Sequence, residues 1–136
     1  MIEVKNIYAG WLTFEFHYGE VSQLFTVSYL NDFRDDMDYL LGINRNGEHK
    51  EYIYKYQNGM ESRAITLDGE GTILKLSIMK EEFEEQIVIT WWLNDDIPVS
   101  MVFGYSSFVE SYLKEMDRIG EKNYKKDFLM EYEREE

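Results

Sequence analysis

Two adjacent carboxylates, Asp95 and Asp96, follow a strand-like segment and are the best-placed candidates for chemistry in this chain. Loops often carry catalytic and binding groups, and glycosidases use paired carboxylates beside a sugar-binding cleft. Trp91 and Trp92 precede the pair, but adjacent strand residues face opposite ways, so only one of them can line a given cleft. Carboxylates are abundant in this chain. The pair therefore indicates either a small enzyme that uses a loop carboxylate or an acidic binding surface.

Metal chemistry has few residues to draw on. The chain has two histidines, His17 and His49, and no cysteine, which excludes disulfides and thiolate metal sites. His17 shares a strand face with Glu15, but zinc requires three or four ligands and no third ligand is evident near this pair. His49 lies in a polar turn region. We therefore expect neither a bound metal nor another cofactor.

The acidic segment 32–38 has the composition of a calcium loop but not its pattern. It lacks the central glycine and the distal bidentate glutamate that such loops require. Asp32 is instead well placed to cap a helix whose first turn holds Asp35 and Asp36, where carboxylates suit the helix dipole. The chain also has no G-x-x-x-x-G-K phosphate loop and no G-x-S-x-G elbow, so we expect no catalytic residues of these classes.

Charge is the strongest compositional signal. The chain has 14 Lys and Arg against 27 Asp and Glu, a formal net charge of −13. Nucleic acids and anionic membranes bind basic proteins, so neither is an expected partner. A basic protein would be attracted, although solubility alone is a sufficient reason for acidity. The acidic residues gather in four segments, at 32–38, 81–85, 95–96 and 131–136.

Apolar periodicity predicts the elements of the first half of the chain. Residues 11–18 alternate, with Leu12, Phe14 and Phe16 on one face, which is typical of a half-buried strand. Helical spacing follows over 33–41, with Gly42 as its stop. Asn58 and Gly59 form a favoured two-residue hairpin loop between strand-like segments at 51–56 and 60–67.

The second half continues with strands and ends in helices. Strands are predicted over 72–79, 86–93 and 98–104, with Pro98 at a strand start or a sheet edge. The segment from Ser107 to Glu110 has the capping-box pattern and predicts a helix over 107–119, and a further amphipathic stretch predicts one over 123–132. No segment has the roughly 20 apolar residues of a membrane helix, and no signal peptide precedes the first strand, so we expect a cytoplasmic protein.

Short turns between successive strands favour antiparallel pairing, and segregated helices favour the α+β class. We therefore predict a single α+β domain over 1–136. It should have an antiparallel sheet of five or more strands, a short helix after the N-terminal strands, and C-terminal helices. The predicted core consists of Phe14, Phe16, Phe25, Leu40, Leu76, Ile78, Ile89, Trp91 and Phe108.

Three segments resemble a group of small bacterial domains found beside polymorphic toxins and known as immunity proteins, the WapI-like group among them. They are VSYLND at 27–32, LDGEG at 67–71, and SYLKEMDR at 111–118 with NY at 123–124. The resemblance implies a protein that binds and neutralises a cognate toxin, with no catalytic residues to carry over.

The expected function is accordingly toxin neutralisation by protein–protein contact with a basic toxin domain. The alternatives are a small enzyme that uses Asp95 or Asp96 and a plain interaction module. The acidic partner-binding candidates are Asp35, Asp36, Asp95 and Asp96. Trp92 is either an aromatic anchor among them, since Trp is enriched at interface hot spots, or ordinary core beneath a helix. The sequence does not predict the oligomeric state.

Overall fold

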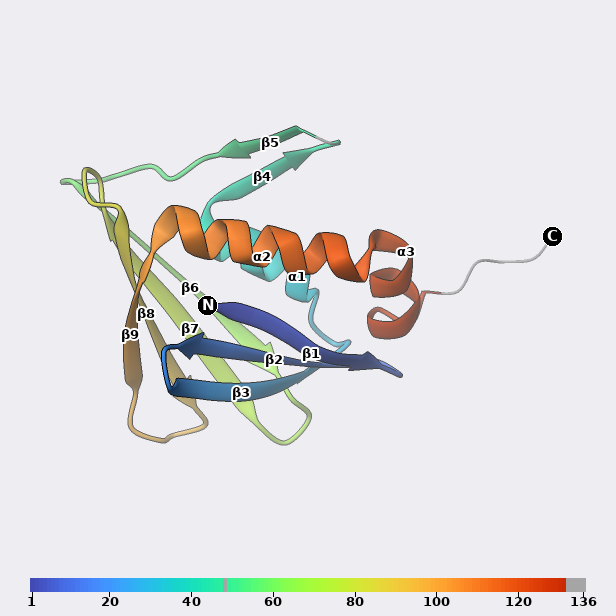
Figure 1. The fold of residues 1–136 in the computed structure, drawn as a ribbon. Helices are drawn as coiled ribbons and strands as arrows, with labels where there is room; N and C mark the ends of the chain where they lie inside the picture. The colour runs from blue at the N-terminus through green and yellow to red at the C-terminus, as the bar shows by residue number, and fades with distance from the viewer. Residues whose placement is uncertain (48, 132–136) are drawn as a thin grey trace.

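The computed structural model of this protein describes residues 1–47 and 49–131 (Figure 1). Within this part of the chain the elements are, in order, β1 (Ile2–Tyr8), β2 (Trp11–Tyr18), β3 (Val21–Ser28), α1 (Phe33–Leu41), β4 (Ile43–Asn46), β5 (His49–Tyr52), β6 (Met60–Asp68), β7 (Ile73–Glu81), β8 (Gln86–Leu93), β9 (Val99–Gly104), α2 (Tyr105–Ile119), α3 (Glu121–Asn123) and a π-helical turn, η1 (Tyr124–Phe128). The strands form three antiparallel sheets, in the orders β1-β2-β3, β4-β5 and β6-β7-β8-β9. The predicted α+β class with antiparallel strands is confirmed.

The first predicted helix has the bounds that its capping residues indicate. Helix α1 begins at Phe33, and the Asp32 side chain accepts a hydrogen bond from the Asp35 backbone N–H. It ends at Leu41, followed by Gly42 in the left-handed conformation at φ 71°. Gly42 is also required by packing, because a Cβ there would lie 2.5 Å from the Tyr54 ring. Its buried face packs toward β6 and β7.

The segment predicted as a strand at 51–56 is only partly a strand. Strand β5 ends at Tyr52 and pairs with β4, whereas residues 53–56 have no strand structure. Tyr54 turns inward instead, and its hydroxyl donates to the Leu40 carbonyl. The predicted Asn58-Gly59 turn is present, with φ of 54° and 77°, but its flanking ladder is reduced to one bridge between Gln57 and Met60.

The capping box predicted at Ser107 is wrong. Helix α2 begins two residues earlier, at Tyr105, and no side chain of its own first turn caps it. The cap comes from the β7–β8 turn, where the Glu85 carboxylate accepts from the Ser106 N–H at 2.6 Å and its carbonyl accepts from the Tyr105 N–H at 2.7 Å. The following helical segment begins at Glu121 and ends at Phe128, before the predicted end at 132, which lies outside the described residues.

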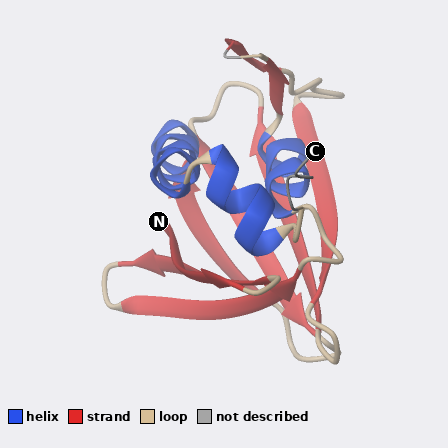
Figure 2. Ribbon diagram, turned by 90° about the vertical axis from the view of Figure 1, so that its right-hand side faces the viewer, coloured by secondary structure: helices blue, strands red, loops and turns tan. Residues whose placement is uncertain are grey.

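The core lies between two sheets and the helices (Figure 2). The β1–β3 sheet packs on one face of the β6–β9 sheet, where Phe16 and Phe25 contact Trp91 at centroid distances of 5.8 and 5.7 Å. Phe108 of α2 adds a further ring, 5.7 Å from Phe16. The face of the β6–β9 sheet that carries these contacts is called here the inner face. The predicted core is confirmed, since each of its residues is buried: Phe14, Phe16, Phe25, Leu40, Leu76, Ile78, Ile89, Trp91 and Phe108.

The edge of β1 is closed by side chains of α2 rather than by another strand. Ser111 accepts from the Ile2 N–H and donates to the Ile2 carbonyl. Glu115 accepts from the Val4 N–H at 2.8 Å, and Arg118 donates to the Val4 carbonyl at 2.7 Å. An open edge would expose these groups to other strands. Helix α2 therefore protects the sheet as well as covering it.

A buried polar network joins the β4–β5 hairpin to the helices. Asp38 of α1 accepts two hydrogen bonds from the Arg45 guanidinium and one from the Tyr112 hydroxyl at 2.7 Å. Burial, and next the Asp38 charge, raises the pKa of the Tyr112 hydroxyl, so Tyr112 stays a donor to the carboxylate. Removing one partner of such a buried pair is strongly destabilising.

Across residues 1–47 and 49–131, no helix is both long enough and apolar enough to cross a membrane.

Candidate functional site

One face of the β6–β9 sheet is covered by none of the helices in the described part of the chain (Figures 1 and 2). Side chains along β7 and β8 alternate between the buried inner face and this exposed face, called here the outer face. Cross-strand pairing makes rows on it. Met79, Val88 and Val102 form an apolar row with exposed fractions of 47%, 37% and 50%. The next row is short and polar, and in it the Thr90 and Ser100 hydroxyls lie 2.8 Å apart. The outer face is therefore flat in the middle and apolar toward one end.

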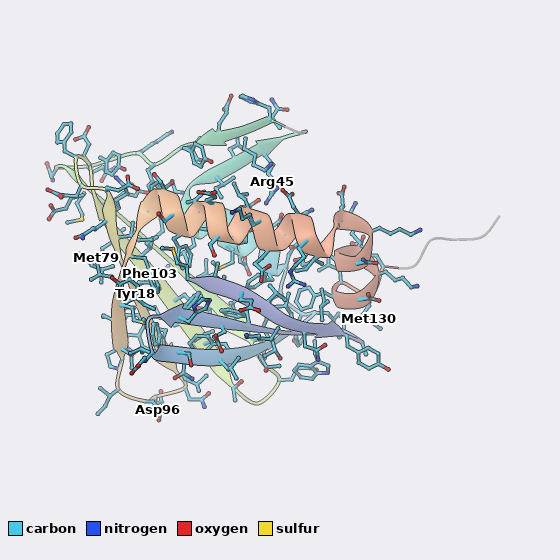
Figure 3. All side chains as sticks on the ribbon, viewed as in Figure 1. Tyr18, Arg45, Met79, Asp96, Phe103 and Met130 are labelled. Atoms are coloured by element: carbon cyan, nitrogen blue, oxygen red, sulfur yellow. The ribbon has the colours of Figure 1, made fainter. Side chains whose placement is uncertain are left out.

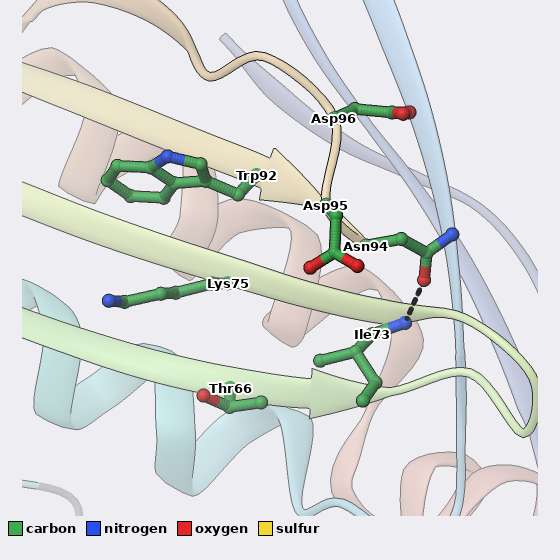
Figure 4. Close-up of a pocket in the computed structure, with 7 residues that line it drawn as sticks. All are labelled: Thr66, Ile73, Lys75, Trp92, Asn94, Asp95 and Asp96. Carbon is green, nitrogen blue, oxygen red and sulfur yellow. Dashed lines mark hydrogen bonds between the residues drawn. The ribbon is translucent and has the colours of Figure 1, made fainter.

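The predicted residues Trp92, Asp95 and Asp96 come together at the other end of this face. They line a hollow of about 430 Å³ with Thr66, Ile73, Lys75 and Asn94 (Figure 4). The Lys75 ammonium lies 5.2 Å from the centroid of the Trp92 ring, a cation–π distance. Trp92 is half-buried and lies on the outer face, so the expectation that it sits beneath a helix is wrong.

The turn that presents the two aspartates is fixed by its first residue. Asn94 adopts φ 54°, a conformation that asparagine tolerates well. Its side-chain oxygen accepts from the Ile73 N–H at 2.9 Å (Figure 4). Its own backbone N–H donates to the Ile73 carbonyl at 2.7 Å. These bonds tie the β8–β9 turn to the start of β7. Asp95 and Asp96 follow directly and are both exposed.

A second hollow, of about 310 Å³, lies at the apolar end of the same face. Its lining residues are Met60, Met79, Glu81, Glu84, Gln86, Val88 and Val102. The outer face thus has an acidic pair at each end, Asp95 with Asp96 and Glu81 with Glu84. Lys75 is the one cation among the residues that line the two hollows.

The structure does not bring Asp35 and Asp36 to this surface. They lie in the first turn of α1, which packs on the inner side of the sheet. Burial, followed by the charge of Asp32, raises the pKa of both carboxyl groups. The three carboxylates lie close together because Asp32 is the N-cap of the helical turn that contains Asp35 and Asp36. The four aspartates predicted as one surface therefore form two separate acidic sites.

The structure corrects the view that Glu15 and His17 lack a third possible ligand. Glu3 lies opposite Glu15 in the β1–β2 pairing, and the ligand atoms of Glu3, Glu15 and His17 all lie within 4.8 Å of one another. The Lys5 ammonium is bound to this group, 3.1 Å from Glu3 and 4.0 Å from Glu15. A cation of the chain itself thus offsets part of the negative charge of the two carboxylates. Glu3 could not be predicted from local patterns, because its place opposite Glu15 depends on a register shift between Val4 and Asn6.

Two further residues of the outer face were missed by sequence reasoning, Lys75 and Asn94. Both become visible only when the pairing of β7 with β8 is known, since Lys75 lies directly opposite Trp92.

Comparison of the chain with protein-family models, with curated proteins and with solved structures finds no match. Function is therefore inferred from the geometry and charge of the described residues.

Proposed function

We propose that this protein binds a basic partner protein through the outer face of the β6–β9 sheet, and that the partner is a toxin domain which it neutralises. The observation that carries the binding proposal is the uncovered face itself, with an apolar row toward the Glu81 and Glu84 end and an acidic pair at each end. The toxin as partner rests on the resemblance of the sequence to immunity proteins.

The composition of the face fits an interface. Protein–protein interfaces combine an apolar, aromatic-rich centre with a polar rim, and contiguous exposed apolar patches mark such sites. Met79, Val88 and Val102 supply an exposed apolar patch. Trp92 supplies an aromatic ring of the type that dominates interface energetics.

The acidic end suggests how a basic partner would be recognised. Lys75 already places an ammonium group against the Trp92 ring. A lysine or arginine of the partner has the same chemistry and would find Asp95 and Asp96 among the residues that line the same hollow as Trp92. The net charge of −13 would steer such a partner over long distances.

A binding role fits this site better than catalysis by Asp95 or Asp96. Asp95 and Asp96 are both exposed, and their hollow opens along a flat sheet face. Acid–base and nucleophilic catalysis depend on positioned groups in a site that excludes water. A protein interface excludes that water only when the partner arrives.

The test pairs this protein with the product of the gene encoded beside it and measures association and dissociation rates at several salt concentrations. Asp95→Lys/Asp96→Lys is compared with Asp35→Lys/Asp36→Lys, which changes the net charge equally at the other acidic site. Both variants should slow association through lost steering. Only the first should speed dissociation, since only it removes contacts. Equal dissociation rates for both variants would rule out the outer face.

Toxin neutralisation is tested separately, in cells. Expression of the neighbouring gene product alone should stop growth, and co-expression of this protein should restore it. A harmless neighbour that still binds would remove the toxin from the proposal and leave the binding face in place.

A further inference from the structure

A third hollow, of about 590 Å³, lies between the β4–β5 hairpin and the corner where α2 meets α3. Its lining residues are Arg34, Arg45, Gly47, Lys50, Met116, Asp117, Gly120, Glu121 and Tyr124. Three cations from three elements, α1, β4 and β5, thus face one space in a chain that has almost twice as many acids as bases. Figure 3 shows Arg45 between the hairpin and α2. None of these residues lies on the outer face.

Arg34 is the unusual member of this group. Its side chain is only 21% exposed, and its Nε is buried without a hydrogen-bond partner, the one such side-chain atom among the described residues. The guanidinium lies 5.3 Å from the Tyr124 ring centroid, and its nearest carboxylate oxygen, on Glu121, is 3.9 Å away. Glu121 is closer to Lys125, at 3.2 Å. Buried donors nearly always have an acceptor, and among the described residues the Arg34 Nε–H has none.

The other two cations differ in how far they are already engaged. Arg45 gives two of its N–H groups to Asp38, and its guanidinium also interacts with the Tyr112 side chain. Lys50, on β5, has no ion pair with any described residue, although its side chain is partly buried. Counting only partners among residues 1–47 and 49–131, the hollow therefore contains a guanidinium without a hydrogen bond (Arg34), a partly engaged guanidinium (Arg45) and an ammonium without an ion pair (Lys50).

We propose that this hollow binds a small phosphate-bearing molecule, with Arg34, Lys50 and the remaining N–H groups of Arg45 around the phosphate. Arginine forks match phosphate oxygens in geometry and charge, and lysine adds a point charge. Asp117 and Glu121 line the same space and offer acceptors for hydroxyl groups of the organic part. The volume lies within the ~300–1,000 Å³ of small-molecule sites. This site and its ligand are independent of the proposed function.

The experiment titrates the protein with ribose 5-phosphate, with inorganic phosphate and with ribose, in a chloride buffer of matched ionic strength. Two-dimensional NMR follows the Nε–Hε resonance of Arg34. Both phosphate compounds should shift this resonance with saturation, and ribose should not. An unmoved Arg34 resonance would overturn the proposal without any mutation.

Variants then locate the site. Lys50→Met should raise the ribose 5-phosphate concentration for half-saturation about tenfold, since a hydrogen bond to a charged group is lost. Lys55→Met, an exposed lysine that does not line the hollow, makes the same charge change and should leave that concentration unaltered. Equal effects of the two variants would show that phosphate responds to net charge alone, which would also overturn the proposal.

Discussion

Trp91 and Trp92 are neighbours in the chain and lie in two different environments. Trp91 is 5% exposed on the inner face and contacts Phe16 and Phe25. Trp92 lies on the outer face, half-buried, with Lys75 against its ring. The same four strands thus make a core on one side and an open surface on the other. The comparison separates residues that stabilise the fold from residues free to bind.

The largest expected difference is in stability. Trp91→Ala should lower the free energy of unfolding by about 3–5 kcal/mol, because it removes a large buried side chain and leaves a cavity. Trp92→Ala should lower it by only about 1 kcal/mol or less, as for most surface substitutions. Chemical denaturation of both variants measures the two values. Similar losses would mean that Trp92 also belongs to the core.

For binding, in contrast to stability, substitution of Trp92 should have a large effect. Trp92→Ala should weaken the complex with the basic partner by about 2 kcal/mol, or roughly thirtyfold in Kd, as expected for an aromatic hot spot. Isothermal titration calorimetry with the neighbouring gene product measures this change. Val99→Ala is the control, because Val99 is exposed, at 46%, but pairs with Trp91 on the inner side of the sheet. A stronger loss at Val99 would move the interface away from the outer face.

Substitution of Asp95 and Asp96 should have a smaller effect on binding, mainly on the association rate constant. Asp95→Lys/Asp96→Lys should lower the association rate constant about tenfold at low salt, with a smaller ratio at high salt, since steering is screened by ions. Stopped-flow fluorescence at two salt concentrations measures both ratios. A ratio that does not change with salt would show that these aspartates act only by contact.

The smallest effect concerns the acidic site away from the outer face. Burial, and then Asp32 and Asp35, raises the pKa of Asp36 above its usual 3.8, so its ionised form is disfavoured in the folded chain. Its contribution to stability is present below the unfolded pKa and is lost as pH rises through the folded pKa. Asp36→Asn should therefore be more stable than the wild type at pH 7, by less than about 0.5 kcal/mol because the site is partly screened.

This difference between Asp36→Asn and the wild type should shrink as the pH is lowered through that window, and thermal unfolding across a pH series measures it. A less stable variant at pH 7 would mean that the favourable interaction of Asp36 with the α1 dipole outweighs the repulsion.

Local patterns in the sequence predicted the elements whose signals are local. The bounds of β2 and β8 follow from alternation, and those of α1 follow from Asp32 and Gly42. The start of α2 was missed because its cap, Glu85, comes from a turn twenty residues away in the chain. Partners supplied by distant segments leave no local pattern, which explains the error at Ser107.

The candidate site shows the same limit. Sequence predicted that Trp92, Asp95 and Asp96 belong together, because they are neighbours in one strand and its turn. It joined Asp35 and Asp36 to them on charge alone, and charge does not specify on which side of a sheet a helix packs. Lys75, Asn94 and Glu3 needed strand register, which is set by tertiary packing.

The closure of the β1 edge by Ser111, Glu115 and Arg118 has a consequence for how the protein folds. The bonded residues are separated by 109 to 114 positions in the chain. Contacts of such high sequence separation form late and slow the folding of a domain. In synthesis at about 5–20 residues per second, β1 leaves the ribosome roughly 5–20 s before the residues that seal it. The time during which β1 can pair with a wrong strand is thus set by the speed of translation.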